Sequence, residues 1–538
     1  MLSTQAYDQN YVIPLPPIRR MGGDSIEVLQ LRTGQVEHYK TTSAILNRFY
    51  FYIDGSEMGL GKTYIAGAHA ITRKLPMLVI CNVAARNNWL NVCSTYGISL
   101  WNLSETGGVI TYETLRSRKG CQPKHGLLRR DDSGETPQFY ATSLFNKIVE
   151  QGVLIIFDEC QKLKNNGSQY RAAKALVRQL YAAGGISRAG FLSGTAMDKP
   201  EHSVTFLRLA CFIEQRNLYS KVQGQIRLEG IEDLYIWANR INPQALTQFR
   251  LNNPFLATQK GSVDYVFKLF IEVIKPGIMS IMPSLQLDKD IKNGYYRLDP
   301  ESEQDYIKAI ASLASAVRYN ASTGVVIRNK ENMGAITTSQ IALQKAKMKA
   351  MARKAREHLI GNPNCKVILY SDYNDIINTL LQLLSDFNPM ELTGRIKERR
   401  RNEVEALFQE HNNNYRLIIA NPKVGGLSIN LHDTNGSFPR FTYMMPGYMI
   451  NENHQATGRT ARDGLIGKAT IRFFYGLSGA KENGILTALA RKGEVMQKVH
   501  LEQGAKFPNE YEDEYEESGP SPSNIIMINP SQLVYTRK

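Results

Sequence analysis

The chain has 538 residues, 43% of them hydrophobic, and this length predicts about three to five folding units. Length and composition exclude collagen-like, disordered and small disulfide-scaffold proteins. There is no run of about 18 apolar residues and no basic start followed by an apolar core at the N-terminus, so we expect neither a transmembrane helix nor a secretory signal. The six cysteines form no CxxC pair, which favours a reduced, intracellular protein without a zinc site.

The net charge of +15 is unevenly distributed along the chain. Residues 1–215 carry a net charge of +7 and residues 216–360 a net charge of +8, whereas basic and acidic residues balance in the remainder. A basic excess of this kind fits a polyanionic partner, most plausibly nucleic acid. Charge that serves only solubility is the alternative.

Short apolar strands alternate with helical segments in two parts of the chain. The first part predicts strands at 49–54, 77–82, 108–112, 153–159 and 189–194. The second predicts strands at 366–372, 390–394, 415–421, 440–445 and 469–476. Near-continuous apolar strands separated by helices are typical of parallel sheets covered on both faces. We therefore predict two α/β lobes.

The remaining segments lack this alternation. Residues 216–360 are expected to form a mainly helical insertion and linker between the lobes. Residues 510–517 read EYEDEYEE and precede a Ser/Pro run, a composition that favours a flexible tail or an interaction segment. The predicted division is an N-terminal extension (1–30), lobe one (31–215), the insertion (216–360), lobe two (361–503) and an acidic tail (504–538).

The predicted strand at 49–54 leads into GSEMGLGKT at 55–63. A glycine-rich loop between a strand and a helix turns its backbone N–H groups toward phosphate oxygens. In such a loop Lys62 would reach the β and γ phosphates and the Thr63 hydroxyl would bind Mg²⁺. The strict pattern has Gly where this chain has Ser56. A glycine-rich turn without a ligand is the alternative.

Polar residues also follow two later strands. Asp158 and Glu159 end the strand at 153–159, where open α/β sheets bind ligands. Asp158 is expected to hold Mg²⁺, and Glu159 to orient or deprotonate the attacking water; an acid pair that caps the next helix is the alternative. Ser193 and Thr195, after the strand at 189–194, are expected to sense the γ-phosphate, with a simple turn as the alternative.

The second lobe contains GGLSINL (425–431) and HQATGRTARDG (454–464). Arg459 and Arg462 are three residues apart, so both can face one side of a helix start or turn. Arginines delivered from one lobe onto a nucleotide held by another form an arginine finger. Solvated helix charge is the alternative.

In this order the motifs resemble those of superfamily-two helicase-type ATPases and, within them, the SWI/SNF-type DNA translocases, over about residues 29 to 500. The resemblance implies an α/β fold of two tandem RecA-like lobes that binds ATP and Mg²⁺. It implies that Gln35 in LRTGQVEHY reads adenine and that EMGLGKT is the phosphate loop. The site residues that it implies are Gln35, Gly59, Gly61, Lys62, Thr63, Asp158, Glu159, Gln455, Arg459 and Arg462.

The chain departs from the family pattern at three places. Gln161 in DECQKLKN stands where the family usually has His, and Met197-Asp198 replaces a stretch that usually contains Pro. Residues 116–150 lengthen the spacing before the acidic motif. No histone-reading appendage is visible, and the compact form resembles enzymes of large DNA viruses and phages.

Two basic segments are candidates for contacts with the phosphate backbone of nucleic acid. RSRKGCQPKHGLLRR (116–130) follows ITYETL, which resembles a motif that lines the nucleic-acid track. KAKMKAMARKAR (345–356) contains six basic residues and no acidic ones. Its charges spread around much of a helix, so a solvated linker is the alternative for this segment.

Three functions fit these features. The first is an ATP-dependent translocase on duplex DNA that remodels protein–DNA or transcription complexes, with a protein partner from the transcription or replication machinery. The second is a strand-separating DNA or RNA helicase. The third is an ATP-gated nucleic-acid-binding structural subunit with little turnover. The expected location is intracellular, in the cytoplasm, the nucleus or, for a viral form, the virion.

Overall fold

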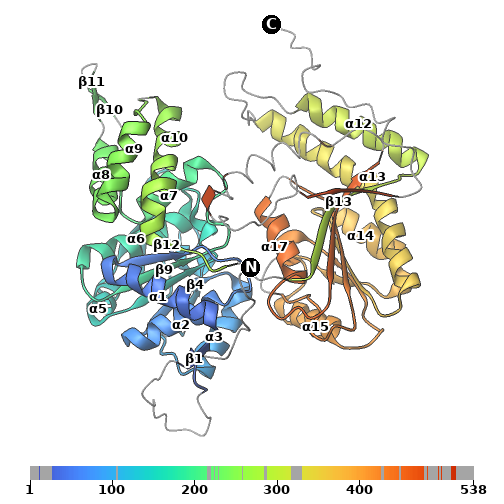
Figure 1. The fold of residues 1–538 in the computed structure, drawn as a ribbon, viewed down its shortest axis with the longest axis horizontal. Coiled ribbons are helices and arrows are strands. Elements are labelled where there is room, and N and C mark those ends of the chain that lie inside the picture. The colour runs from blue at the N-terminus through green and yellow to red at the C-terminus, as the bar shows by residue number, and fades with distance from the viewer. Residues whose placement is uncertain are drawn as a thin grey trace, which may run out of the picture. The chain divides into compact units, whose positions relative to one another are not determined.

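The computed structural model forms two compact units (Figure 1). Unit 1 consists of Met1–Ser284 with Glu494–Gly504, and unit 2 of Leu285–Gly493 with Ala505–Lys538. The structure describes residues 11–12, 27–103, 107–214, 220–222, 225–227, 229–256, 258–283, 287–316, 330–425, 429–447, 450–477 and 511–516, together with a few single residues between 218 and 499.

Unit 1 contains a six-stranded sheet in which all the described pairings are parallel. In sheet order its strands are β12 (Met279–Ser280), β3 (Phe51–Asp54), β9 (Arg188–Leu192), β8 (Leu154–Asp158), β4 (Met77–Cys81) and β5 (Val109–Thr111). Its helices include α1 (Thr33–Arg48), α2 (Lys62–Arg73), α3 (Arg86–Thr95), α4 (Tyr112–Arg116), α5 (Ser143–Gln151), α6 (Ser168–Ala183) and α7 (Pro200–Leu209).

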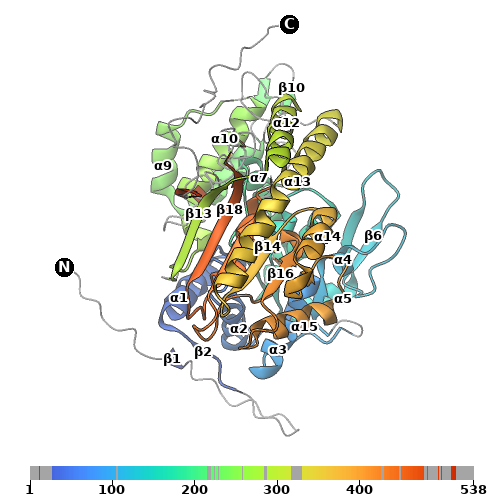
Figure 2. The same ribbon diagram turned by 90° about the vertical axis from the view of Figure 1, so that its right-hand side faces the viewer.

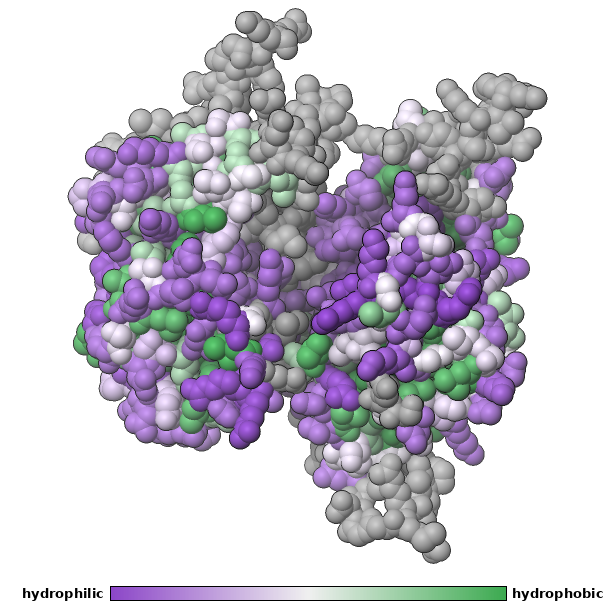
Figure 3. Space-filling view, turned by 180° about the vertical axis from the view of Figure 1, so that it is seen from behind, coloured by the Kyte–Doolittle hydropathy of each residue, from purple (hydrophilic) through white to green (hydrophobic). Residues whose placement is uncertain are grey.

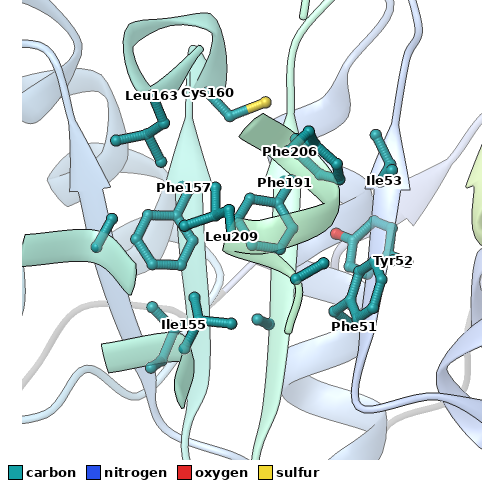
Figure 4. Close-up of a cluster of buried hydrophobic side chains, with 14 of the residues drawn as sticks. Phe51, Tyr52, Ile53, Ile155, Phe157, Cys160, Leu163, Phe191, Phe206 and Leu209 are labelled. Carbon is teal, nitrogen blue, oxygen red and sulfur yellow. The ribbon is translucent and has the colours of Figure 1, made fainter. Parts of the chain in front are cut away.

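Aromatic side chains from the central strands form the core next to the ends of these strands (Figure 4). Phe157 on β8 stacks on Phe191 on β9, with ring centroids 5.0 Å apart. Phe206 on α7 meets Phe191 edge-on at 5.2 Å, and Phe51 on β3 meets it at 5.9 Å. These contacts hold β3, β9 and β8 as neighbours and so set the relative positions of the loops that follow them.

Part of the predicted insertion belongs to unit 1 as additional helices. They are α8 (Glu229–Ile241), α9 (Pro243–Asn252), α10 (Gln259–Leu269), the π-helical turn η3 (Phe270–Ile274) and α11 (Lys275–Ile278). A small hairpin, β10 (Ser220–Val222) and β11 (Gln225–Arg227), precedes them. Trp237 on α8 stacks on Phe212 with ring centroids 4.4 Å apart, which ties these helices to the core of unit 1.

Unit 2 contains a seven-stranded parallel sheet. In sheet order its strands are β15 (Met390–Leu392), β16 (Leu417–Ala420), β14 (Lys366–Tyr370), β17 (Arg440–Met444), β18 (Ala469–Gly476), β13 (Lys289–Tyr296) and β19 (Asp513–Tyr515). Its helices are α12 (Pro300–Ala316), α13 (Lys330–Gly361), α14 (Asn374–Leu383), α15 (Glu398–Gln409), α16 (Pro422–Gly425) and α17 (Ile450–Thr460).

The predicted architecture of two α/β lobes with parallel sheets is confirmed, because each of the ten predicted strands overlaps a strand of one of the two sheets. The single helical insertion over 216–360 is not observed. Residues up to Ser284 belong to unit 1, and those from Leu285 belong to unit 2. The segment also contains strands, and β13 pairs with β18 along its whole length. Its sequence, KDIKNGYY, does not reveal the strand because only its second half is buried.

The acidic tail was predicted to be a flexible tail or an interaction segment, and its described residues form ordered contacts within unit 2. Residues 513–515 form the edge strand β19, which lies parallel to β13. Glu514 accepts hydrogen bonds at 2.8 Å from Nε and Nη2 of Arg472, and Glu516 pairs with Arg353 at 2.7 Å. Tyr515 stacks on Tyr295 with ring centroids 4.9 Å apart. Acidic side chains are stable at this edge because the sheet presents cations to them.

The basic segment 345–356 is part of α13 and is neither a solvated linker nor an array of free cations. Lys347 is fully buried, and its ammonium lies 2.5 Å from Glu482, which also accepts from the Tyr306 hydroxyl at 3.0 Å. Arg353 pairs with Glu357 and Glu516, and Lys354 with the same two acids. Arg356 pairs with Asp386. Most of this charge is therefore neutralised inside unit 2.

The surface is mainly hydrophilic on the face shown in Figure 3, where hydrophobic side chains form small, separate patches over both units. Among the described residues, no helix has both the length and the apolar composition needed to cross a membrane.

The buried pair of Lys347 and Glu482 gives a stability prediction for unit 2. Lys347→Met leaves the Glu482 carboxylate buried without its cation, which should cost about 3–5 kcal/mol of unfolding free energy. The double variant Lys347→Met/Glu482→Gln should recover part of this loss, because a neutral amide can still accept from Tyr306. The measurement is urea unfolding followed by circular dichroism. Lys349→Met removes a half-exposed cation of the same helix and is the matched control. Equal losses of unfolding free energy in Lys347→Met and Lys349→Met would contradict the stabilising role of the buried pair.

Candidate nucleotide-binding site

The ends of three neighbouring strands are level in the sheet of unit 1. β9 lies between β3 and β8, and Leu192 at its end is paired with Asp54 on one side and with Asp158 on the other. The loops that begin at residues 55, 159 and 193 therefore start at the same edge of the sheet. This is the carboxyl edge, where parallel α/β sheets bind their ligands.

The glycine-rich loop between β3 and α2 depends on two glycines with left-handed backbone. The φ angles of Gly59 and Gly61 are 85° and 87°. At Gly61 a Cβ would lie 2.3 Å from the side-chain nitrogen of Gln35, so space and conformation both require glycine. Gly61 directly precedes α2, so the loop leads its backbone N–H groups to a helix N-terminus, which is a favourable site for an anion.

Lys62 is half-buried and lies across this loop. Its ammonium donates to the backbone oxygens of Ser56 and Glu57, both at 2.8 Å. The lysine thus donates to backbone oxygens of the loop, and a phosphate oxygen could take their place as the acceptor. Thr63 follows it in the first turn of α2 and is also partly exposed, so its hydroxyl is available to a ligand at the same helix end.

A buried polar network that was not predicted from the sequence contacts the first residues of the glycine-rich loop. Asp54 accepts from the backbone N–H of Ser56 at 3.0 Å and pairs with Nε2 of His38 at 3.0 Å. Burial raises the pKa of Asp54, but His38 and the hydrogen bonds outweigh it, and the pKa is lowered overall. Nδ1 of His38 is 3.0 Å from the Ser280 hydroxyl, and the Ser56 hydroxyl accepts from Met282 N–H at 2.9 Å.

This network gives Ser56 a structural role at the position where the strict loop pattern has glycine. Its hydroxyl ties the loop to residues just before the boundary between the two units at Ser284. In the sequence, this network could have been suspected only from Asp54, an acidic residue at the end of the apolar strand β3.

The acid pair lies at the end of β8. Trp89 on α3 donates from its indole nitrogen to one carboxylate oxygen of Asp158 at 2.8 Å, and the Glu159 N–H donates to the other at 3.0 Å. Burial and the charge of Glu159 raise the pKa of Asp158 to about 6, against the opposing effects of the Trp89 hydrogen bond and Lys62. Glu159 has left-handed backbone with φ of 53°, which turns the chain away from the strand.

A chain of hydrogen bonds joins Glu159 to the loop after β9. The Gln161 amide donates to the Glu159 carboxylate at 2.6 Å, and its oxygen accepts from the Ser193 hydroxyl at 2.6 Å. Ser193 in turn accepts from Thr195 N–H at 3.0 Å. Gln161, which departs from the family pattern, can make both links because an amide carries a donor and an acceptor.

The loop after β9 also touches the glycine-rich loop, since a Cβ on Gly194 would lie 3.0 Å from the Ser56 oxygen. The second departure, Asp198, forms an ion pair with Lys164 and lies against Nδ1 of His202, both at 2.9 Å. Burial raises the pKa of Asp198, but these partners lower it overall. The two departures therefore help to hold the segments that follow β8 and β9 together.

Gln35 lies against the same loop. Its side-chain oxygen accepts from Arg32 N–H and its nitrogen donates to the Leu60 oxygen, both at 3.0 Å. The side chain is buried and caps the start of α1. The structure brings Gln35 to the phosphate-loop candidate, and its reading of adenine stays a prediction.

The predicted residues of the second lobe gather in unit 2. Gln455 and Arg459 are on α17, Gln455 being half-buried and Arg459 buried, and Arg462 follows the helix. Arg462 donates to the Asn430 side chain, and Glu405 accepts from Asn430 N–H at 2.9 Å. Burial raises the pKa of Glu405, and the positive charges of Arg462 and Arg459 act in the opposite direction.

Both arginines therefore have partners within unit 2. Of the motif GGLSINL, residues 426–428 lie outside the described residues. The described residues contain no group of three or more His, Cys, Asp or Glu side chains placed to hold a metal ion by themselves.

The chain is similar to several known proteins. Residues 350–464 match the family described as helicase conserved C-terminal domain, a range that includes Gln455, Arg459 and Arg462. Over 478 residues the chain is 24% identical to a protein of Acanthamoeba polyphaga mimivirus whose name gives it as an ATP-dependent RNA helicase, and the match covers 85% of this chain and 81% of that protein.

Two solved structures are also similar. One is the SWI2/SNF2 ATPase core of Sulfolobus solfataricus in complex with dsDNA, with 15% identity, a TM-score of 0.29 and coverage of 88% of this chain and 93% of that one. The other is the C-terminal part of the Fun30 ATPase domain, with 13% identity, a TM-score of 0.27 and coverage of 40% and 98%.

The raised pKa of Asp158 predicts a pH dependence of ATP hydrolysis. Because its pKa is raised, Asp158 takes up a proton at a higher pH than an ordinary aspartate, and kcat/KM should fall by about tenfold per pH unit below that pKa if the ionised form is required. Trp89→Phe removes an N–H that stabilises the ionised form, so the acid limb should move to higher pH. The measurement is kcat/KM for ATP between pH 5 and 8. Trp101→Phe is the control, and an unmoved limb in Trp89→Phe would contradict the role of the indole.

Proposed function

We propose that this chain, a superfamily-two helicase-type ATPase, is a translocase on double-stranded DNA that remodels protein–DNA or transcription complexes. The observation that carries the ATPase is the single sheet edge that joins the glycine-rich loop, Asp158 and the chain from Glu159 through Gln161 to Ser193. The preference for duplex DNA rests on the SWI/SNF-type motifs EMGLGKT and DECQKLKN and on the basic excess within residues 1–360.

In this proposal the residues of unit 1 bind and orient ATP. The loop 55–61 and the start of α2 hold the phosphates, and Lys62 exchanges the Ser56 and Glu57 oxygens for phosphate oxygens. The Thr63 hydroxyl and the Asp158 carboxylate are hard oxygen ligands that fit Mg²⁺, which would neutralise charge on the phosphates. Glu159 accepts the proton of the attacking water.

Gln161 positions Glu159 in this scheme. Its amide nitrogen donates to one carboxylate oxygen of Glu159 at 2.6 Å. Its amide oxygen accepts from Ser193, which is in the loop that contacts Ser56 and Glu57. A ligand that changes the glycine-rich loop can therefore act on the water-orienting carboxylate through short, partly buried hydrogen bonds. Electrostatic interactions of such preorganised polar groups are strong because the effective dielectric constant of the surrounding protein is low.

Gln455, Arg459 and Arg462 complete the site from unit 2. Their role is to stabilise charge on the transferring phosphoryl group when the two units close on ATP and nucleic acid. Arg462 must then leave Asn430, so closure exchanges internal contacts for contacts to phosphate. A protein partner from the transcription or replication machinery also belongs to this proposal.

The substrate preference is tested by ATPase assays with no nucleic acid, single-stranded DNA, duplex DNA and RNA. Duplex DNA should stimulate hydrolysis most, and ATP should drive displacement of a protein or a third strand from duplex DNA without unwinding it. The second candidate is a strand-separating helicase, favoured by the name of the mimivirus relative. Strongest stimulation by RNA, or efficient unwinding of forked duplexes, would replace the first proposal with the second.

The arginines give a separate prediction of mechanism. Arg459→Ala or Arg462→Ala should reduce single-turnover hydrolysis by about 10³–10⁵, while ATP affinity falls much less, because the contacts form mainly in the reacting state. Arg→Lys should recover little, since a point charge cannot copy the fork of a guanidinium. Arg399→Ala, which removes a highly exposed arginine of the same unit, is the control. Turnover close to that of the parent in both alanine variants would exclude the closure mechanism.

A further inference from the structure

The segment that lengthens the spacing before the acidic motif forms a separate structural feature of unit 1. Between α4 and α5 lie a loop at 117–127 and an antiparallel hairpin of β6 (Leu128–Asp131) and β7 (Gln138–Ala141). Figure 2 shows the hairpin standing out beside α4 and α5. None of its residues has a part in the nucleotide site described above.

One buried arginine organises the first half of the loop. Arg130 is 6% exposed and forms a bidentate ion pair with Asp132 at 2.8–2.9 Å. Its Nη1 donates to the backbone oxygens of Arg116 and Ser117, both at 2.9 Å. Asp132 also accepts from Gly120 N–H at 2.8 Å. The guanidinium and its carboxylate thus fix the backbone at three points between residues 116 and 120.

Two further side chains fix the second half. Gln122 exchanges two hydrogen bonds with the backbone of Arg130, at 2.7 Å and 2.9 Å. His125 is buried, donates from Nε2 to the Leu115 oxygen at 3.1 Å and accepts from Leu127 N–H at 3.1 Å. Burial lowers the pKa of His125, which keeps the ring neutral as this pattern requires. Hydrogen bonds and an ion pair within the segment therefore fix the backbone of the loop 117–127 at both ends and in the middle.

Four exposed side chains of this segment are basic, and Glu135 between the two strands of the hairpin is an exposed acid. Arg118, Lys119, Lys124 and Arg129 are exposed. The guanidinium of Arg129 lies over the ring of Tyr140, 5.1 Å from its centroid, and this ring is 46% exposed. The two acids of this segment accept hydrogen bonds, Asp132 from Arg130 and Gly120, and Asp131 from Ser133 N–H at 3.0 Å. These bonds lower the pKa of both acids, and the positive charges of Arg129 and Lys119 lower the pKa of Asp131 and Asp132, respectively, further. Within the described part of the chain, no acid forms an ion pair with Arg118 or Lys124.

We propose that these four cations and Tyr140, together the basic loop surface, form a preorganised binding surface for the phosphate backbone of nucleic acid. Clustered like charges repel one another, and a rigid backbone prevents them from moving apart, so a polyanion relieves this repulsion on binding. Side chains on a fixed loop also lose less conformational entropy when they bind. The choice of nucleic acid as the polyanion rests on the proposed function.

The contacts should be independent of base sequence, since charge and a single aromatic ring recognise backbone and sugar rather than base edges. The basic loop surface differs in this respect from the segment 345–356 of α13, where most basic residues have acidic partners inside unit 2. Equal basic composition in the two segments thus leads to different roles.

The test compares two triple variants of the full chain with the same change in charge. Arg118→Gln/Lys119→Gln/Lys124→Gln alters the basic loop surface, and Lys74→Gln/Arg178→Gln/Lys268→Gln alters exposed cations elsewhere on unit 1. Affinity for duplex DNA and for single-stranded nucleic acid is measured by fluorescence anisotropy at several salt concentrations. For duplex DNA the loop variant should lose about 0.9 of logarithmic salt slope per phosphate contact removed, and the control should retain the parent slope.

Hydrolysis without nucleic acid should remain at the parent level in both triple variants, because neither changes the nucleotide site. A loop variant with the parent slope, or equal losses in both variants, overturns this inference and leaves the proposed function in place. A parent chain that binds no nucleic acid overturns the proposed function and this inference with it.

A separate variant tests whether the ordered backbone of the loop contributes to DNA binding. Gln122→Ala removes the two hydrogen bonds to Arg130 and leaves every charge in place. DNA affinity should fall at an unchanged salt slope, because the same cations bind from a less ordered loop. Unchanged affinity in Gln122→Ala would show that charge alone is sufficient and would overturn the claim of preorganisation.

Discussion

The register of three parallel strands is the constraint on which the candidate site depends. β9 pairs with β3 and with β8 so that Leu192 lies opposite both Asp54 and Asp158. A shift of one residue in either pairing would turn the side chains at that strand end to the other face of the sheet. The stacked rings of Phe157 and Phe191 resist such a shift, since they interlock the two strands just below their ends. The chemistry at the sheet edge is therefore a consequence of packing in the core.

The polar side chains of the candidate site in unit 1 already have partners before any ligand binds. Lys62 is bonded to two loop oxygens and Glu159 to Gln161. Binding of ATP must exchange these contacts rather than fill empty positions, so its net free energy is the difference between two sets of hydrogen bonds.

Buried charges organise several other parts of the molecule. Lys347 with Glu482 connects α13 to a residue distant in sequence, Arg130 with Asp132 shapes the loop before β6, and Arg472 with Glu514 holds β19 at the edge of the sheet. Removing one member of such a pair is costly because the other remains desolvated. The basic excess of the chain thus has two uses, and only the cations without internal partners are available to a polyanion.

The ten strands of the two α/β lobes and the motifs at their ends could be predicted from local sequence. A buried parallel strand is apolar along its whole length, and the glycine-rich loop needs a residue that tolerates the left-handed backbone found at Gly61. The charged and mixed segments, by contrast, depend on contacts in the folded chain. β13 and β19 are strands because of neighbours far along the chain, and the segment 216–360 divides at Ser284 because its two halves pack on different sheets. Lys347 is buried against Glu482, a residue 135 positions further along the chain, whereas Arg118 is exposed and forms no ion pair within the described residues. Pairing partners at such separations leave no periodic trace in the local sequence, which is why composition indicated two basic segments as candidates for a polyanion-binding surface but could not show that most cations of 345–356 have acidic partners.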